Sequence, residues 1–481
     1  MMYGEEKSDS LIVAAKQANN PKGAESVERR SGAKGNAEQP HMRRTQSRES
    51  MSQRLSRVRE AAKQRKKERF TALFHLLTVE ALEAAFLSLS RKAAAGVDGI
   101  RWMDYAGNMK NNITDLHRRL HQGSYRAQPG RRHYIPKADG KQRPLGIASL
   151  EDKIVQYALV KILNAVYEND FMGFSYGFRP GRSQHDALDA LATGLVRTNV
   201  NWVLDADISQ FFDRVSHEWL IRFTEHRIGD RRVIRLIRKW LTAGTSEEGQ
   251  WRATEEGTPQ GAVISPLLAN IYLHYVFDLW AHQWRRRYAT GNVVMVRYAD
   301  DIVIGFDKRY DARRFRIAMQ RRLREFGRFA AENRAIRGKG KPETFNFLGF
   351  THISGKDRNG RFMLIRKTRR DRMTATLKAI KDGLRRRWHY SIPEQGKWLR
   401  RVVQGYLNYH SVPGNYPMMR KFRIYVTDLW RRALRRRSQQ DDTTWTKANR
   451  LAAVWLPKVR VLHPWPVERF TARHPRQEPG A

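Results

Sequence analysis

Two adjacent carboxylates, Asp300 and Asp301, lie between apolar runs in the segment VRYADDIVIGF, residues 296–306. Apolar runs on both sides of a polar pair predict a β-hairpin with the two acids at its tip. Aspartate is favoured in turns for local reasons, so turn chemistry is one interpretation. The other is divalent-metal binding, because hard carboxylate oxygens are preferred ligands of Mg²⁺.

A third carboxylate, Asp207, ends the predicted strand VLDAD. Nucleotidyl transfer uses two divalent metals about 3.5–4 Å apart, flanking the attacking and leaving oxygens. Such a site needs carboxylates that converge from different strands. We expect Asp207, with the Ile208 carbonyl nearby, to join Asp300 and Asp301. Asp205 shares this strand face but lies farther from its end, and a helix N-cap is the alternative for Asp207.

The charge balance of the chain predicts a polyanionic partner. Lys and Arg total 91 of 481 residues against 48 Asp and Glu, which gives a formal net charge of +43. A nucleic-acid backbone is the natural counter-ion for such an excess. No apolar run approaches the ~20 residues that span a bilayer, and the N-terminal segment lacks a signal-peptide pattern. We therefore expect a cytoplasmic protein with no membrane partner.

The elements that would position these acids can be read from hydrophobic periodicity and turn residues. They alternate between strands and helices, which predicts an α+β fold. In chain order we expect a basic helix or arm at 52–69, a helix capped by Thr78, two strands in 133–150 around an Asp139-Gly140 turn, and helices at 151–168 and 183–197. A strand that becomes helical follows over 201–215, and then come a long apolar helix at 262–285 and the 296–306 hairpin. After the hairpin we expect a helix capped by Asp311, with Phe315, Met319, Leu323 and Phe326 on one face, and a short strand at 345–350.

Composition divides the chain into four parts. Residues 1–50 are polar and expected to be disordered, and 51–365 carry the strands and acids. Residues 366–450 are basic and helical, and 451–481 form a basic, irregular tail. Four tryptophans lie among the basic residues of these helices. Their aromatic rings can stack on unpaired bases or form the hydrophobic core. The tryptophans are Trp388, Trp398, Trp430 and Trp445.

Six blocks in order across residues 133–350 resemble the reverse transcriptase family, and within it the proteins encoded by bacterial group II introns. They are IPKADGKQRPLGI, YGFRPGRS, DADISQFFDRV, GTPQGAVISPLLANIYL, VRYADDIVIGF and FNFLGF. The segment GYLNYHSVPGN (405–415) resembles the thumb of that family, also called domain X or the maturase domain. The resemblance implies a right-hand polymerase-like fold, with fingers, a palm built on an antiparallel sheet, and an α-helical thumb.

The resemblance implies roles for the acids and for one aromatic residue. Asp207, Asp300 and Asp301, with Ile208, would hold two Mg²⁺ ions, with Mn²⁺ as an alternative metal. Phe212 matches the aromatic steric gate that favours dNTP over NTP, and ordinary core packing is its alternative. Asp213, by contrast, is expected to be a helical surface or capping residue.

Further residues match positions that contact the incoming nucleotide. Lys137 and Arg143 match basic residues of the fingers that meet the triphosphate, although either is also compatible with a solvated surface charge. Gln260 matches the residue beside nucleotide and template. Gly257 and Gly261, which flank it, would let the backbone approach the substrate closely.

The resemblance also implies contacts with nucleic acid. Arg179 and Arg182 would hold template phosphates, or serve as ordinary charges at a helix start. Arginines of the basic helices are expected to bind phosphates of intron RNA; these are Arg385, Arg386, Arg387, Arg431, Arg432, Arg435 and Arg436.

The chain departs from the family pattern in two places. A strand-turn block with a lysine, between the helix after YADD and FLGF, is missing, so we expect the strand beside the hairpin to be absent. Lys339 and Lys341 lie nearby, but neither has the right sequence context. The zinc endonuclease found in many relatives is also expected to be absent, because the chain has no cysteine.

The sequence therefore predicts a group II intron-encoded RNA-directed DNA polymerase. It would bind its structured intron RNA, assist splicing and mobility, and extend a DNA primer with dNTPs. The missing block favours one alternative, an RNA-binding maturase with a defunct polymerase site. A domesticated reverse transcriptase in defence is a further alternative, and the sequence does not indicate an oligomeric state.

Overall fold

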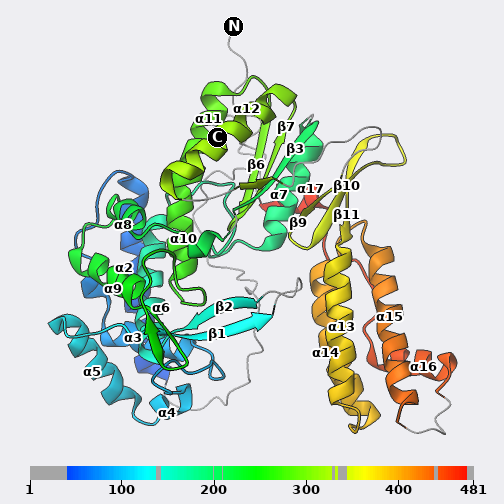
Figure 1. Cartoon of the computed structure of the whole chain (residues 1–481), viewed down its shortest axis with the longest axis horizontal. Helices are drawn as coiled ribbons and strands as arrows, with labels where there is room; N and C mark the ends of the chain where they lie inside the picture. The colour runs from blue at the N-terminus through cyan, green and yellow to red at the C-terminus, as the bar shows by residue number, and fades with distance from the viewer. Residues whose placement is uncertain are drawn as a thin grey trace.

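The computed structural model describes residues 41–136, 142–198, 200–208, 210–327, 331–333, 344–437 and 443–473. It confirms an α+β architecture. Figure 1 shows a cluster of N-terminal helices, a central sheet above a projecting β-hairpin, and a helical bundle that stands to one side. None of the described helices combines the length and apolar character needed to cross a lipid bilayer.

The N-terminal helices pack around α6, which is buried along much of its length. Thr78 caps α3 as predicted, because its side chain accepts a hydrogen bond from the Ala81 amide. Residues 1–40 of the expected disordered segment lie outside the described residues, but 41–50 are helical, so that part of the prediction is wrong. The elements are α2 (His41–Gln64), η1 (Phe74–Leu76), α3 (Val79–Ser88), α4 (Trp102–Ala106), α5 (Met109–Gln122) and α6 (Leu150–Tyr167).

The predicted strands at 133–150 form an antiparallel hairpin, β1 (Gly130–Pro136) and β2 (Gln142–Ile147). Two short strands, β4 (Thr245–Glu247) and β5 (Gln250–Arg252), extend it into a four-stranded sheet with the order β2-β1-β4-β5. The Asp139-Gly140 turn lies outside the described residues.

A second four-stranded sheet, antiparallel throughout, lies at the centre with the order β6-β7-β3-β8. Its strands are β3 (Trp202–Ile208), β6 (Val293–Tyr298), β7 (Asp301–Phe306) and β8 (Ala331–Asn333). Helix α7 (Gln184–Arg197) packs against β6, and α12 (Arg309–Phe326) packs against β3 and β7. Because helices cover this sheet, β6 and β7 read as continuous apolar runs, and Ile302, Val303 and Ile304 are fully buried.

The prediction that this sheet has lost its fourth strand is wrong. Strand β8 pairs antiparallel with β3 and places Glu332 opposite Asp207 in the register. A three-residue strand therefore occupies the position beside β3, even though the usual sequence block is missing. Lys339 and Lys341 lie outside the described residues.

The long apolar helix predicted at 262–285 has a break in its regular hydrogen bonding. It consists of α10 (Ser265–Leu273), a π-helical turn η3 (His274–Asp278) and α11 (Leu279–Tyr288). Such π-turns insert an extra residue into a helix and recur near functional sites. Here the turn ends at Asp278, which is fully buried.

Asp311 does not cap its own helix, which corrects the prediction made for it. Helix α12 begins after Lys308, and Asp311 lies buried in the first turn. Its Oδ2 accepts hydrogen bonds from the amides of Thr290 and Gly291 at 2.8 and 3.1 Å. It therefore fastens the loop that leads into β6. Phe315, Met319 and Leu323 form the buried face of the helix as predicted.

A three-stranded sheet joins the centre to the helical bundle. The segment FNFLGF is not one strand: it ends β9 (Thr344–Phe347), turns at Leu348 and begins β10 (Phe350–Lys356). Strand β11 (Phe362–Thr368) completes the sheet, so the predicted boundary at 366 falls inside a strand. The bundle consists of α13 (Arg370–Arg386), α14 (Ile392–His410), α15 (Tyr416–Arg435) and α16 (Trp445–Trp455).

The expected irregular tail contains a helix, α17 (Pro466–Arg473), that returns to the centre and packs on α7 (Figure 1). Phe470 buries its ring there. Asp189 of α7 is almost fully buried and forms ion pairs with Arg366 of β11 and Arg469 of α17. The C-terminal segment thus connects the bundle to the central sheet, an arrangement that local sequence patterns do not reveal.

Candidate functional site

The strand register brings the three predicted carboxylates to one edge of the central sheet. Asp207 of β3 lies opposite Asp301 of β7. Tyr298 of β6 also pairs with Asp301, which leaves Ala299 and Asp300 as a two-residue turn at the hairpin tip. All three carboxylates are partly exposed. Ile208, the other predicted ligand, is buried, but its position in β3 keeps its backbone beside Asp207.

The charges around Asp300 are arranged for a cation. Burial raises the pKa of Asp300, and the neighbouring charge of Asp207 raises it further, while Arg143 and Arg297 oppose both effects. In the described part of the chain, no three acidic or histidine side chains converge tightly enough to enclose an ion by themselves.

A fully buried ion pair holds the hairpin in place. Arg297 of β6 donates to both carboxylate oxygens of Asp278 at 2.7 and 2.6 Å, and both side chains are completely buried. The remaining guanidinium donors reach Ser175 Oγ at 2.7 Å, Asn270 Oδ1 at 3.2 Å and the Ala299 carbonyl at 3.0 Å. Sequence reasoning missed this network, although an arginine in an apolar strand and an aspartate in an apolar helix were visible signals.

The hairpin tip is strained and clamped. Ala299 has a φ of 56°, in the left-handed region, which costs an L-residue about 1–2 kcal/mol. The hydrogen bond from Arg297 to its carbonyl holds it there. On the other side, a Cβ on Gly177 would lie 2.3 Å from the Ala299 nitrogen, so only glycine fits. Asn270 fixes Gly177 by donating to its carbonyl at 2.7 Å. Tight packing therefore determines where Asp300 points.

Aromatic rings lie beside the carboxylates. Phe212, in the short helix η2 (Phe211–Asp213) after β3, is half-buried and makes edge-to-face contacts with Phe178 at 6.4 Å and Phe211 at 5.4 Å. Phe178 also lies 6.5 Å from the ring of Tyr298. Phe212 thus packs against its neighbours and still presents part of its ring to solvent. Phe178 and Tyr298 were not predicted, although both lie inside recognised blocks.

The TPQG loop is pinned to these elements from both sides. Gln260 Nε2 donates to Asp213 Oδ1 at 2.7 Å, and the Gln260 carbonyl accepts from the Gly146 amide at 2.7 Å. Asp213 is an exposed residue of η2, as predicted, and it also accepts the hydrogen bond that positions Gln260. A Cβ on Gly257 would lie 2.8 Å from the Phe212 carbonyl. A Cβ on Gly261 would likewise lie 3.1 Å from the Gly146 carbonyl. Both glycines therefore let another segment of the protein's own backbone approach closely.

Of the two basic residues predicted near the triphosphate, Arg143 is described. It is exposed on β2, and its charge acts to lower the pKa of Asp300. The β1–β2 hairpin therefore brings a cation to the carboxylate edge. Lys137 lies outside the described residues.

Arg179 and Arg182 differ in how accessible they are to a template: Arg179 is buried, which argues against a phosphate contact, whereas Arg182 is partly exposed and its predicted contact stays a prediction. Arg179 is 4% exposed. It pairs with Glu168 at 2.9 Å and donates to the carbonyls of Met172 and Ser175. Arg182 donates to two carbonyls of the same loop, and burial lowers its pKa to about 10. The donors of Arg179 are thus used by Glu168 and by carbonyls of the same loop.

The arginines of the bundle differ in how free they are to bind phosphate. Arg387 lies 4.4 Å over the Trp398 ring and donates to the Gly383 carbonyl, so it supports the packing of α13 on α14. Arg431 and Arg432 both pair with Asp428. Within the described part of the chain, the exposed members of the predicted set that carry no such pairing are Arg385, Arg386, Arg435 and Arg436.

The tryptophans of the bundle are mostly structural. Trp430 is 1% exposed and donates to Gln395 Oε1 at 2.9 Å. Trp398 packs on Gly383, where a Cβ would clash with its ring. Trp445 differs, because it is 44% exposed and lies under Arg431 at 4.9 Å. Trp430 and Trp398 belong to a core separate from the one that underlies the carboxylate edge.

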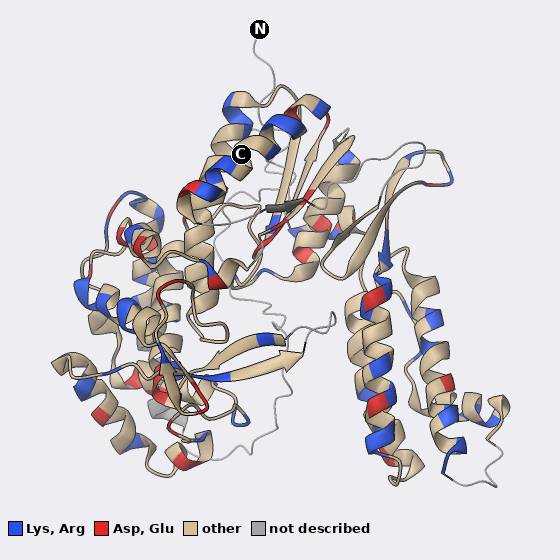
Figure 2. Ribbon diagram, in the orientation of Figure 1, with Lys and Arg blue, Asp and Glu red and all other residues tan. Residues whose placement is uncertain are grey.

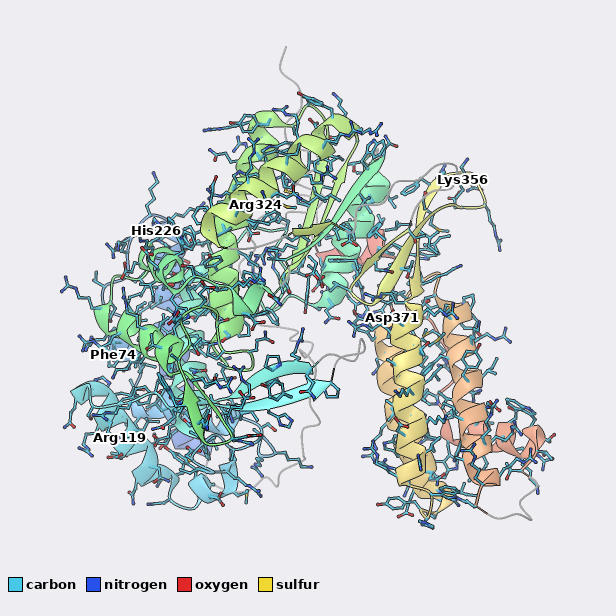
Figure 3. The ribbon with its side chains drawn as sticks, in the orientation of Figure 1. Phe74, Arg119, His226, Arg324, Lys356 and Asp371 are labelled. Atoms are coloured by element: carbon cyan, nitrogen blue, oxygen red, sulfur yellow. The ribbon has the colours of Figure 1, made fainter. Side chains whose placement is uncertain are left out.

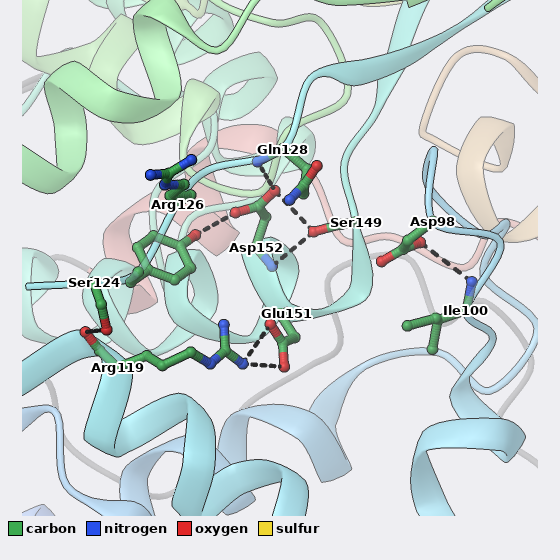
Figure 4. A pocket seen from close by; sticks show the side chains of 10 residues that line it. Asp98, Ile100, Arg119, Ser124, Arg126, Gln128, Ser149, Glu151 and Asp152 are labelled. Carbon is green, nitrogen blue, oxygen red and sulfur yellow. Dashed lines mark hydrogen bonds and ion pairs between the residues drawn. The ribbon is translucent and has the colours of Figure 1, made fainter.

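A hollow of about 430 Å³ lies apart from the carboxylates, at the start of α6 (Figure 4). Its polar groups satisfy one another. Asp152 accepts hydrogen bonds from Ser149 Oγ, the Gln128 amide and the Tyr125 hydroxyl, and Arg119 pairs with Glu151 at 2.8 Å. These contacts tie the loop before β1 to α6, and the hollow is part of the scaffold.

Comparison with known proteins agrees with the order of the blocks. Residues 135–352 match the family model described as reverse transcriptase (RNA-dependent DNA polymerase). The chain is 42% identical over 214 residues to protein YkfC of Escherichia coli, covering 44% of this chain and 55% of that protein. It is 38% identical over 222 residues to the group II intron-encoded protein LtrA of Lactococcus lactis, covering 46% of this chain and 37% of LtrA.

A third relative, an uncharacterized 91 kDa protein in the cob intron of Schizosaccharomyces pombe, is 47% identical over 146 residues, which are 30% of this chain and 18% of that protein. In each case the matched region spans little more than half of the relative, or less.

The Arg297–Asp278 pair generates a prediction about stability. Arg297→Met leaves Asp278 charged and unpaired in the core, which should lower the free energy of unfolding by about 3–5 kcal/mol. The double variant Arg297→Met/Asp278→Leu buries no charge and should recover most of that loss. Urea denaturation measures both.

Amide hydrogen exchange at residues 299–301 should remain faster in the double variant than in the wild type, because the bond to the Ala299 carbonyl is gone. Slow exchange at the wild-type rate would contradict the role given to Arg297.

Proposed function

We propose that the protein is an RNA-directed DNA polymerase, because residues 135–352 match the reverse transcriptase family model and the chain is similar to the group II intron-encoded protein LtrA. It extends a DNA 3′-OH on an RNA template, binds its structured intron RNA, and assists the splicing and mobility of that intron. The observation that carries the proposal is the register that brings Asp207, Asp300 and Asp301 together at one edge of a sheet.

In this proposal the elements take the parts of a right-hand polymerase. Residues 51–365 provide fingers and palm, with the β1–β2 sheet and N-terminal helices as fingers and the β6-β7-β3-β8 sheet as palm. The helices of 366–450 are the thumb, or domain X, and their first turn begins at Arg370. After 451 the chain returns to the central sheet, where α17 packs on α7.

The residues at the carboxylate edge have complementary tasks. Asp207, Asp300 and Asp301, with the Ile208 carbonyl, would hold two Mg²⁺ ions, or Mn²⁺ in their place. Such ions, when bound, lower the pKa of the attacking hydroxyl and stabilise the leaving pyrophosphate. Arg143 contributes positive charge where the triphosphate of a dNTP would lie.

Two further residues would orient the nucleotide. The partly exposed ring of Phe212 suits a position under the sugar, where it would clash with a 2′-OH. Gln260, held by Asp213 and by the backbone of Gly146, suits a position beside the base. Phe212 lies in η2, which follows β3, and Gln260 is hydrogen-bonded to Asp213 of the same short helix. The residues that would bind the nucleotide are therefore held in place relative to the carboxylates.

The alternative of a splicing cofactor with a defunct polymerase site rested on the missing strand. Strand β8 lies beside β3, and the three carboxylates keep their register, so we favour an active enzyme. The maturase half of the proposal rests on the exposed arginines of the bundle, which Figure 2 shows in blue along α13 and α15.

Asp300→Asn tests the metal site. Loss of one charged ligand should lower primer extension on an RNA template by about 100-fold or more, equivalent to several kcal/mol of transition-state stabilisation. RNA affinity should be unchanged. Because burial and Asp207 raise the pKa of Asp300, the neutral amide should raise the melting temperature of the metal-free protein. Asp382→Asn, an exposed change on α13, is the matched control. Near-normal cDNA yield from Asp300→Asn would overturn the assignment.

Phe212→Val tests the proposed sugar contact. Removing the ring where a 2′-OH would lie should raise rNTP incorporation relative to dNTP by about tenfold or more, the usual scale of steric discrimination. Steady-state kinetics with both nucleotides give the ratio. Phe362→Val, at an exposed position on β11, controls for loss of a ring elsewhere. An unchanged ratio would mean that Phe212 serves packing alone.

The double variant Arg385→Ala/Arg386→Ala tests the maturase role. If both arginines contact phosphates, the slope of log K against log salt should become shallower by about 1.4–1.8, and splicing assistance should fall with it. Arg387→Ala should instead lower stability with little change in slope, because Arg387 packs on Trp398. An unchanged slope together with full splicing activity in the double variant would leave only the polymerase half of the proposal.

A further inference from the structure

Helices α11 and α12 pack against each other at the top of the molecule in Figure 1, while the β1–β2 hairpin lies on the other side of the central sheet. Figure 2 shows that Lys and Arg gather along both helices. None of these residues has a part in the chemistry proposed for the carboxylate edge.

The two helices carry an unbalanced charge. Three arginines lie on α11 and seven on α12, against two acidic residues, Asp311 and Glu325. Asp311 is buried under the loop it fastens, so Glu325 is the exposed acid on this pair of helices. The exposed arginines are Arg286, Arg287, Arg309, Arg313, Arg316, Arg321 and Arg324. An 18-residue helix such as α12 is about 27 Å long, which offers phosphate contacts over several nucleotides.

A groove of about 490 Å³ runs between the helices, with an aromatic side and a basic side. Trp280, Trp284 and Tyr288 of α11 line one side. Arg314, Arg321 and Arg322 of α12 lie on the other side together with Glu325, which forms an ion pair with Arg322 at 3.5 Å, so this side keeps a net positive charge. Trp284 is fixed by an edge-to-face contact with Phe315, at 4.9 Å and 89°. Tyr288 is 50% exposed, so its ring is accessible from solvent.

This combination selects a class of ligand. Guanidinium groups pair with phosphate oxygens, and exposed aromatic rings stack on unpaired bases. A purely acidic protein surface would use the arginines but would leave the aromatic side without a matched partner. Double-stranded nucleic acid would expose phosphates but no base face for Tyr288. Unpaired nucleotides satisfy both sides of the groove.

We propose that the α11–α12 groove binds an unpaired segment of RNA, separate from the template at the carboxylate edge. The site extends the proposed function by giving the protein a second RNA contact besides the arginines of the bundle. It rests on the charge and shape of this groove and not on polymerase activity.

The experiment measures binding of a 4-thiouridine-containing 12-nucleotide RNA to the full chain, with the polymerase site saturated by a primer–template duplex. Ultraviolet crosslinking followed by mass spectrometry should place the RNA on α11 or α12. Tyr288→Ala should weaken binding by about fivefold or more through lost stacking, with no change in salt slope. Arg314→Ala/Arg321→Ala should also weaken binding and flatten the slope by about 1.4.

The matched control is Arg316→Ala/Arg324→Ala, which removes the same charge from the same helix outside the groove; Figure 3 labels Arg324. It should lower affinity less than twofold. Equal losses in both double variants would overturn the groove and leave a diffuse electrostatic surface. If polyglutamate displaces the RNA and Tyr288→Ala has no effect on RNA binding, the proposal is overturned in favour of an acidic protein partner.

Primer extension by the Arg314→Ala/Arg321→Ala variant should stay at the wild-type level. If the wild-type protein does not extend primers, the proposed function is refuted. The binding results still test the groove by themselves.

Discussion

The buried ion pair between Arg297 and Asp278 is the interaction on which the carboxylate site depends. It joins the hairpin that carries Asp300 to the π-helical turn of the long helix, and through Ser175 to the loop before α7. Burying two charges is expensive unless nearly every donor finds an acceptor, and here the guanidinium meets a carboxylate, an amide oxygen, a hydroxyl and a carbonyl. The gain is a hairpin tip with one defined conformation.

The same rule explains how a chain with a net charge of +43 uses its few acids. Several acidic residues neutralise arginines inside the fold, and the carboxylate edge takes three more. Exposed arginines that lack such partners then remain available for polyanions. The buried pairs are Arg297 with Asp278, Arg366 with Asp189, Arg227 with Asp170 and Arg179 with Glu168.

Sequence patterns were sufficient for the carboxylates, because strand alternation and a hairpin turn are local properties. The patterns place Asp300 and Asp301 at the hairpin turn and Asp207 near the end of β3, and the register makes Asp300 a turn residue and Asp301 the first residue of β7. Arg179 could not be assigned in this way, since its burial depends on how its own loop folds back to bring the carbonyls of Met172 and Ser175 against it. The position of α17 could not be predicted either, because Arg469 meets Asp189 across 280 residues of sequence. The folded arrangement of the chain, which periodicity does not reveal, decides whether an arginine is structural or free.

The central claim is that the clamped hairpin and β3 form a two-metal site. Anomalous X-ray diffraction from crystals of the protein with primer–template, dNTP and Mn²⁺ tests it most directly. The account predicts two anomalous peaks about 3.5–4 Å apart, each within coordinating distance of carboxylates among Asp207, Asp300 and Asp301. Anomalous peaks elsewhere, with none at this edge of the sheet, would contradict it.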